Sequence, residues 1–240
     1  MLTSGPKKNS AGIAWDITAL ERLYKSIDSR FMSWRASPVS AFYLESSGPW
    51  MHALERPLRI QDMIFETDRL FIRNWTLDDA EALYEIYRNP EVVQFLGATP
   101  KTTDSVEEAK SDLEQWFLVQ AKRSEGHDEW AIVRKEDEKV IGNTMCKSLP
   151  NNEKKPSGEL EIGWHLGREY WGMGYATESA RAVAEYGFRV NPDIPRLLAL
   201  VYSANAASQK VARNIGMVHL GLSSNYYGVE LEVFELKRRE

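Results

Sequence analysis

Residues 166–178 read LGREYWGMGYATE and form the most informative stretch of the chain. An alternating apolar pattern over residues 159–166 ends there, a glycine-rich turn follows, and a helical pattern begins at about Tyr175. Gly172 and Gly174 allow the backbone to approach an anion without a Cβ in the way, and a helix N-terminus adds free N–H groups. The stretch therefore predicts a phosphate-binding turn between a strand and a helix.

Two common phosphate-binding motifs do not fit this turn. A P-loop needs a Lys and then a Ser or Thr after its second Gly, and Met173 and Gly174 occupy those places. The dinucleotide motif GxGxxG fails because Thr177 stands where the third Gly belongs. Nucleoside triphosphate and NAD sites are therefore disfavoured.

A third motif does fit. Residues 171–178, WGMGYATE, resemble the pyrophosphate loop Q/R-x-x-G-x-G/A of the GNAT N-acetyltransferases, in the WGxGYATE form of the RimJ/RimL-type branch. Trp171 departs from the Gln or Arg of the general motif. Residues 205–217, NAASQKVARNIGM, resemble the family's NxxSxxV helix, and residues 66–80 resemble its entry strand and first helix. The resemblance covers roughly residues 65–238.

The resemblance implies a mixed α/β (α+β) fold. Its central twisted sheet is mostly antiparallel, is splayed open at the acetyl-CoA site and is flanked by helices. The hydrophobic periodicity is compatible with this fold. It predicts strands at 70–72, 130–133, 139–142, 159–166 and 197–202, and helices at 76–88, 105–122, from 175, and 205–215.

The resemblance also implies acetyl-CoA as co-substrate, with no metal. Its pyrophosphate is expected on backbone N–H groups between Gly172 and Thr177, and its pantetheine arm along the strand that ends at Leu166. An N–H near His165 or Leu166 would then polarise the thioester carbonyl. The expected cofactor-binding residues are Leu166, Trp171, Gly172, Met173, Gly174, Tyr175, Ala176, Thr177, Asn205 and Ser208.

Amine attack on a thioester requires a base, and Glu161 is the first candidate. It matches the acidic residue of the family's AEIGY-like segment. Glu159 and His165 share its face of the predicted strand and remain alternatives.

The general acid is less well defined. Many GNAT enzymes use a Tyr at the position that Ala212 occupies here. The resemblance leaves Ser208 as the best-placed hydroxyl, with Tyr202, Tyr226 and Tyr227 as alternatives. Cys146 lies in no motif, so a covalent acetyl-cysteine route is not expected, and Trp116, Phe117, Trp130 and Trp164 are predicted to be core residues.

The composition is that of an ordinary soluble protein. Of 240 residues, 43% are hydrophobic and 27% are charged, and the single cysteine excludes a disulfide framework. The four histidines show no metal-binding spacing. We therefore expect a cytoplasmic protein without a membrane span.

Charge separates the chain into two parts. Residues 1–62 carry eight basic and six acidic side chains, a net charge of +2. Because the whole chain has a net charge of −5, residues 63–240 have a net charge of −7. So acidic a body is poorly suited to nucleic acid. We expect an N-terminal extension over 1–62, poorly ordered except for one amphipathic helix at 17–34, and a GNAT domain over 63–240. The helix could instead serve self-association or bind a partner, and the resemblance allows a homodimer.

The expected function is an acetyl-CoA-dependent N-acetyltransferase that acts on a primary amine, either a protein N-terminus or a small molecule, by direct attack on the thioester. A non-catalytic acetyl-CoA sensor is the alternative, because the usual acid is missing at Ala212. Acceptor choice is expected to lie in loops 90–104 and 147–158 and in the tail after Gly221.

Overall fold

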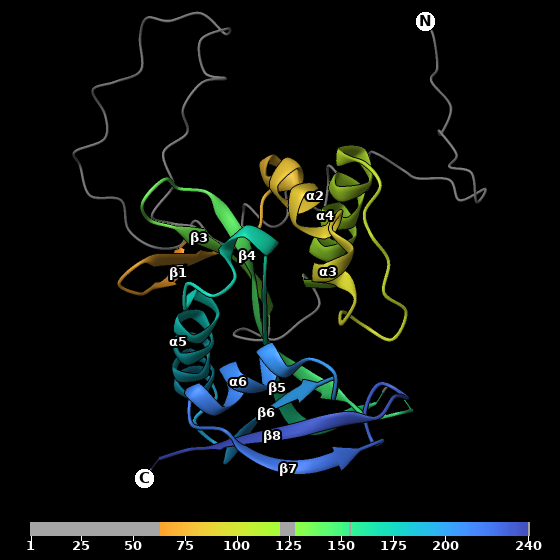
Figure 1. Cartoon of the computed structure of the whole chain (residues 1–240). Coiled ribbons are helices and arrows are strands. Elements are labelled where there is room, and N and C mark those ends of the chain that lie inside the picture. Colours follow the sequence, from red (N-terminus) through yellow and green to blue (C-terminus); the bar gives the residue numbers. More distant parts are fainter. Residues whose placement is uncertain (1–62, 121–127, 154, 240) are drawn as a thin grey trace, which may run out of the picture. The chain divides into compact units, whose positions relative to one another are not determined.

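The computed structural model describes residues 63–120, 128–153 and 155–239 (Figure 1). The extension over 1–62, including the helix expected at 17–34, lies outside these residues. Within them, no helix combines the length and apolar character needed to cross a bilayer.

The described residues form a sheet of eight strands in the order β1-β2-β3-β4-β5-β6-β8-β7. Every neighbouring pair is antiparallel except β5 and β6, which are parallel. The prediction of a mixed, mostly antiparallel sheet is confirmed. The strands are β1 (Met63–Glu66), β2 (Leu70–Arg73), β3 (Asp128–Arg134), β4 (Val140–Pro150), β5 (Pro156–Leu166), β6 (Arg196–Val201), β7 (Val218–Ser223) and β8 (Leu231–Lys237).

Helices flank the sheet, as expected. The α-helices are α2 (Ala80–Tyr87), α3 (Pro90–Val93), α4 (Val106–Gln120), α5 (Tyr175–Val190) and α6 (Ala206–Asn214), and the short 3-10 helices are η2 (Leu77–Asp79) and η3 (Arg168–Tyr170). The start predicted at Thr76 is confirmed, because Thr76 and Asp79 form a capping box there. Asn89 caps α3, and Pro90 occupies its first turn.

The two faces of the sheet are buried in two separate clusters. On one face α5 and α6 supply Val183, Ala184 and Ala212 to a cluster that includes Ile162 and Phe234. On the other face, α2 and α4 cover Ala131 and Val133 of β3. The full cluster there is Trp75, Ala80, Leu83, Ile86, Val92, Ala109, Leu113, Ala131 and Val133.

Alternation along β5 determines which of its side chains face each cluster. Leu160, Ile162 and Leu166 belong to the cluster beneath α5 and α6. Glu161 and His165 point to the opposite face, where His165 meets Tyr87 of α2. The strand thus places His165 against α2 and Glu161 on the same side of the sheet.

The aromatic residues predicted to form the core divide into two groups. Trp130 is buried, as predicted. Trp116, Phe117 and Trp164 are only partly buried, and two of them, Trp116 and Trp164, line the large cavity described below. The prediction is therefore incomplete for these residues, because periodicity cannot separate a core stripe from a cavity wall.

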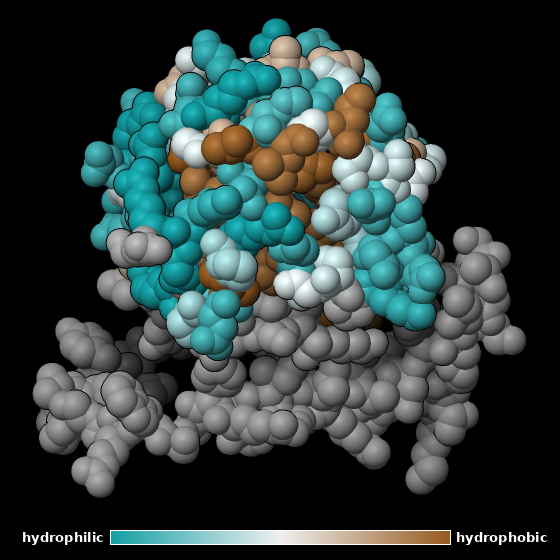
Figure 2. All heavy atoms as spheres, turned by 90° about the horizontal axis from the view of Figure 1, so that it is seen from below, coloured by the Kyte–Doolittle hydropathy of each residue, from teal (hydrophilic) through white to brown (hydrophobic). Residues whose placement is uncertain are grey.

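The strand β7 forms one edge of the sheet and carries exposed apolar side chains at Val218, Leu220 and Leu222. A hydrophobic band among hydrophilic residues is visible on the face seen from below, the side on which β7 lies (Figure 2). Its pairing with β8 is interrupted by a bulge between His219 and Gly221. A bulge twists an edge strand and thereby hinders pairing with another chain.

Candidate active site

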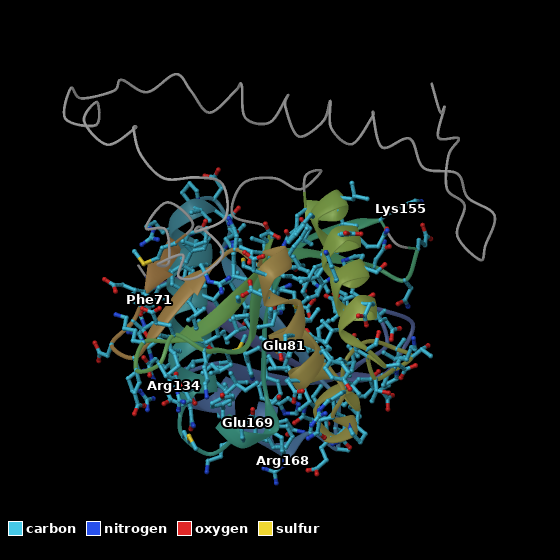
Figure 3. All side chains as sticks on the ribbon, turned by 90° about the horizontal axis from the view of Figure 1, so that it is seen from above. Phe71, Glu81, Arg134, Lys155, Arg168 and Glu169 are labelled. Carbon is cyan, nitrogen blue, oxygen red and sulfur yellow. The ribbon has the colours of Figure 1, made fainter. Side chains whose placement is uncertain are left out.

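A cavity of about 920 Å³ opens between the sheet and the helices. It is bounded by the C-terminal halves of β5 and β6, the turn before α5, the first turns of α6, the segment after α3 and the loop between β7 and β8. Figure 3 shows Lys155, next to the start of β5, at the upper right and Arg168, two residues after its end, at the bottom. The loops expected at 90–104 and after Gly221 both reach the cavity, through residues 94–98 and through Tyr227 and Val229.

The glycine-rich turn stands at one end of this cavity. Gly172 and Gly174 adopt φ values of +78° and +84°, in the left-handed region that only glycine adopts easily. Gly174 is the N-cap of α5, and the first helical bond closes from the Glu178 N–H to the Gly174 carbonyl. The preceding N–H groups therefore have no acceptor within the helix, and Tyr175, Ala176 and Thr177 line the cavity. The turn has the geometry of an anion site.

The turn is braced by a residue that the motif does not contain. The Arg69 guanidinium donates to the Met173 carbonyl at 3.0 Å, and its Nε donates to the Glu178 carboxylate at 2.7 Å. Thr67 Oγ1 donates to the same carboxylate at 2.5 Å. Glu178 thus ties the β1–β2 connection to the start of α5, and Met173, whose side chain is exposed, does not line the cavity.

The cavity enters the sheet where β5 and β6 part. Among the described residues these strands are in register only at Glu161 and Leu198. Beyond that pair, toward Leu166, both strands line the cavity. Trp171 closes this end by donating its indole N–H to the Leu166 carbonyl at 2.9 Å. The splayed sheet thus presents free strand edge to the cavity.

The helix α6 forms the wall opposite the turn. The Asn205 side chain caps it by accepting the Ser208 N–H at 3.1 Å, and both residues line the cavity. Ala212 is fully buried in the core. The α6 position at which the resemblance led us to look for a general acid is therefore packed into the protein.

Glu161 lies deep in the cavity and is only 5% exposed. Burial raises the pKa of its carboxyl group, and the nearby Glu129 adds to this, while Lys147 and a hydrogen bond from Tyr227 oppose it. A carboxyl with a raised pKa is a better proton acceptor near neutral pH than an ordinary one.

Tyr227 donates its hydroxyl to Glu161 from the loop between β7 and β8. That residue has φ +56°, which is uncommon for a bulky side chain. The loop is tied to the β4–β5 hairpin, because Asn152 accepts the Gly228 N–H at 3.0 Å and donates to the Ser224 carbonyl at 2.6 Å. These bonds fix the loop from which the Tyr227 hydroxyl reaches Glu161.

A second carboxylate and an ammonium share the sheet face with Glu161. Lys147 lies opposite Glu161 in the β4–β5 register, and its Nζ lies 3.1 Å from Oε1 of Glu129 on β3. Glu129 is 8% exposed, and both residues line the cavity.

His165 is partly buried beside Tyr87, whose hydroxyl lies 2.5 Å from its Nε2. Burial lowers the pKa of His165 to about 4, so the ring is neutral at neutral pH. Burial also raises the pKa of Tyr87 well above its usual range, so its hydroxyl stays protonated and donates to the imidazole. A group with this pKa is a weak proton acceptor, which disfavours His165 as the base.

Glu159, the other alternative base, lies elsewhere. It forms an ion pair with Arg196, which also donates to Glu235 at 2.9 Å, and it does not line the cavity. Cys146 is buried, and this burial raises the pKa of its thiol to about 12. Neither group is placed to act on a ligand in the cavity.

The structure thus brings Glu161, Ser208, Asn205 and the 172–177 turn into one cavity. Sequence reasoning missed Arg69, Tyr87, Glu129 and Lys147 and left Tyr227 unplaced. Each of these contacts joins residues far apart in the chain, as with Tyr227 and Glu161, 66 residues apart. The strand register of β3, β4 and β5 is the signal that could have brought Glu129 and Lys147 together.

Comparison with known proteins is consistent with this geometry. Residues 69–218 match the sequence profile described as an acetyltransferase (GNAT) domain. The chain is 31% identical over 164 residues to YoaA of Bacillus subtilis, an uncharacterised N-acetyltransferase, covering 68% of this chain and 87% of that protein. It is 29% identical over 180 residues to the uncharacterised N-acetyltransferase p20 of Bacillus licheniformis, covering 72% and 96%.

Solved structures share the fold. The microcin C7 self-immunity acetyltransferase MccE, in complex with acetyl-CoA and AMP, superposes with a TM-score of 0.57 over 72% of this chain and 94% of that one, at 17% sequence identity.

Proposed function

The chain belongs to the GNAT family of acetyltransferases, and from that premise we propose that it transfers the acetyl group of acetyl-CoA to a primary amine by direct attack on the thioester. One observation carries this proposal. A single cavity joins an anion-binding turn, an opening between β5 and β6, and a buried carboxyl group whose pKa is raised. We assign the activity to residues 63–240.

The residues present fit acetyl-CoA. A Cβ at Gly172 would meet no atom within 4 Å, so the backbone of the turn is open on that side. The N–H groups at the start of α5 would hold the pyrophosphate. The free edge of β5 near Leu166 would bind the pantetheine arm as a strand binds its neighbour, and Asn205 and Ser208 would flank it from α6. On the same fold, MccE holds acetyl-CoA.

Bound acetyl-CoA would supply a thioester whose carbonyl carbon is open to attack by the amine. Glu161 would take the proton that the acceptor ammonium must lose, directly or through a water molecule. Ser208, which lines the cavity on the α6 side, would return a proton to the leaving sulfur. A backbone N–H near His165 or Leu166 would stabilise the developing oxyanion.

A covalent route through the protein has no support in the described residues. The Cys146 thiol is buried, and its pKa of about 12 keeps it protonated. Direct attack needs only the base and the binding groups named above.

The acceptor is an amine that reaches Glu161 past residues 94–98 and the Tyr227 loop. To test the function, the full-length chain is mixed with acetyl-CoA and a panel of amines: short peptides with free N-termini, polyamines, simple alkylamines and aminoglycosides. We expect amine-dependent release of free thiol and an acetylated amine detected by mass spectrometry. Tight acetyl-CoA binding without turnover on any amine would favour a non-catalytic acetyl-CoA-binding module. Absence of acetyl-CoA binding would overturn the proposal.

A further inference from the structure

Lys147 lies on β4, between the strands that carry the two carboxylates of the cavity, Glu129 on β3 and Glu161 on β5. Directly opposed residues of an antiparallel pair point to the same side of the sheet. Lys147 is opposed by Glu161, and Glu129 is opposed by Met145, which lies two residues before Lys147 on β4. All three ionisable side chains therefore emerge on one face, the one that the cavity exposes.

The two carboxylates differ in whether a cationic side chain forms an ion pair with them. Glu129 is paired with Lys147, at 3.1 Å. Glu161 accepts a hydrogen bond from the neutral hydroxyl of Tyr227; the charge of Lys147 acts on it, but within the described residues Lys147 forms its ion pair with Glu129. Buried carboxylates are stable when a cation pairs with them. The protein thus supplies the cation for Glu129, and the ammonium of an acceptor can supply the one for Glu161.

From this arrangement we propose that Lys147 is a specificity-determining residue: it occupies Glu129 and so restricts the acceptor to amines without a second ammonium near the reacting one. The proposal rests on the proposed function. Adjacent strands lie about 4.8 Å apart, and Glu129 and Glu161 are also offset by two residues along the strands, so they are separated by about 12 Å at the backbone. A short diamine could span this separation, with one ammonium on the Glu161 carboxylate and the other on the Glu129 carboxylate. In the wild type, such a diamine would have to displace an ammonium that is tethered in place.

The test compares matched amines on matched variants. Initial rates of thiol release are measured with butan-1-amine against 1,4-diaminobutane, and with hexan-1-amine against 1,6-diaminohexane. The readout is the ratio of kcat/KM for the diamine to that for the monoamine. Because both amines use the same base, any change in the basicity of Glu161 cancels in this ratio.

We expect the wild type to favour the monoamine of each pair. Lys147→Met should raise the diamine-to-monoamine ratio about tenfold or more, because the second ammonium gains the Glu129 carboxylate. Lys147→Arg keeps the cation and should keep the wild-type ratio. The double variant Glu129→Gln/Lys147→Met removes the vacated charge, and its ratio should fall back to near the wild-type value.

The double variant also guards against misfolding, because it does not leave the buried Glu129 carboxylate without its lysine. An unchanged ratio in folded Lys147→Met, or a gain that persists in the double variant, would overturn the inference while leaving the transferase activity established. If the wild type turns over no alkylamine, binding is measured instead, as the rise in Tm that each amine causes. 1,4-Diaminobutane should then raise the Tm of Lys147→Met more than butan-1-amine does, and should not do so for the double variant. Equal shifts would overturn the inference.

Discussion

At the scale of single residues, the contact between Tyr227 and Glu161 changes the pKa of the proposed base. The phenol hydroxyl stabilises the ionised carboxylate, so it holds the pKa of Glu161 below the value that burial alone would give. The strained backbone at Tyr227, with φ +56°, is retained because the Asn152 contacts fix the loop.

We predict that Tyr227→Phe moves the acidic limb of the kcat/KM profile to higher pH by about one unit. Loss of the donor raises the pKa of Glu161, and a base must be ionised to act, so a higher pH is needed to reach full activity. The control is Tyr226→Phe, because Tyr226 packs on Leu149 and Leu198 rather than on the base. An unmoved limb in Tyr227→Phe would show that the hydroxyl does not act on the ionising base.

The candidate base could be named from the sequence, but its surroundings could not. Glu161 lies in an alternating segment beside the glycine-rich motif, so position and resemblance both point to it. Lys147 and Glu129 carry no local signal, because their pairing depends on how β3, β4 and β5 align. Glu159 and His165 looked equivalent to Glu161 by alternation, and only the ion pair with Arg196 and the burial beside Tyr87 separate them.

At the scale of elements, the turn between β5 and α5 acts through its backbone. Gly174 has φ +84°, and a Cβ there would lie 3.3 Å from the Arg69 guanidinium that braces the turn. Gly158 has the same φ of +84° at an exposed hairpin position and would meet no atom within 4 Å. Both glycines therefore need a positive φ, but only Gly174 lines the cavity.

We predict that Gly174→Ala raises KM for acetyl-CoA about tenfold, because the N–H groups of the turn no longer converge on the pyrophosphate. Both substitutions should lower the free energy of unfolding by about 1–2 kcal/mol, because each puts a Cβ at a positive φ. Gly158→Ala should leave KM for acetyl-CoA unchanged. Steady-state kinetics and urea denaturation of both variants check this. An equal change of KM in the two would mean that strain alone, and not the turn, accounts for it.

The elements themselves were largely predictable from periodicity. The helices at 105–122 and 205–215 were expected close to their observed bounds, because capping residues mark them. The turn between β3 and β4 was also expected, but β4 continues to Pro150, well beyond the predicted strand at 139–142. The bracing of the turn was not predictable, since Arg69 and Glu178 are 109 residues apart. The contact of Tyr87 on α2 with His165 on β5 was likewise not predictable, since the two residues are 78 apart.

At the scale of the folded body, stability depends on both faces of the sheet being covered. Leu113 of α4 is fully buried in the cluster that α2 and α4 make with β3. Leu113→Ala should lower the free energy of unfolding by about 2–5 kcal/mol through lost contacts and a residual cavity. Val119→Ala, at a 49% exposed position of the same helix, should change it by less than about 0.5 kcal/mol. Similar effects of the two would show that α4 is not packed as described.

In the proposed reaction, the buried Glu161 carboxylate in the opening of the sheet activates an amine for attack on acetyl-CoA. This step is tested most directly by the single-turnover rate of acetyl transfer in Glu161→Gln at saturating acetyl-CoA, with Glu159→Gln as the matched control from the same strand. We predict a rate about 100-fold or more below wild type for Glu161→Gln, with acetyl-CoA affinity retained, and a near wild-type rate for Glu159→Gln. A full transfer rate in Glu161→Gln would contradict the account.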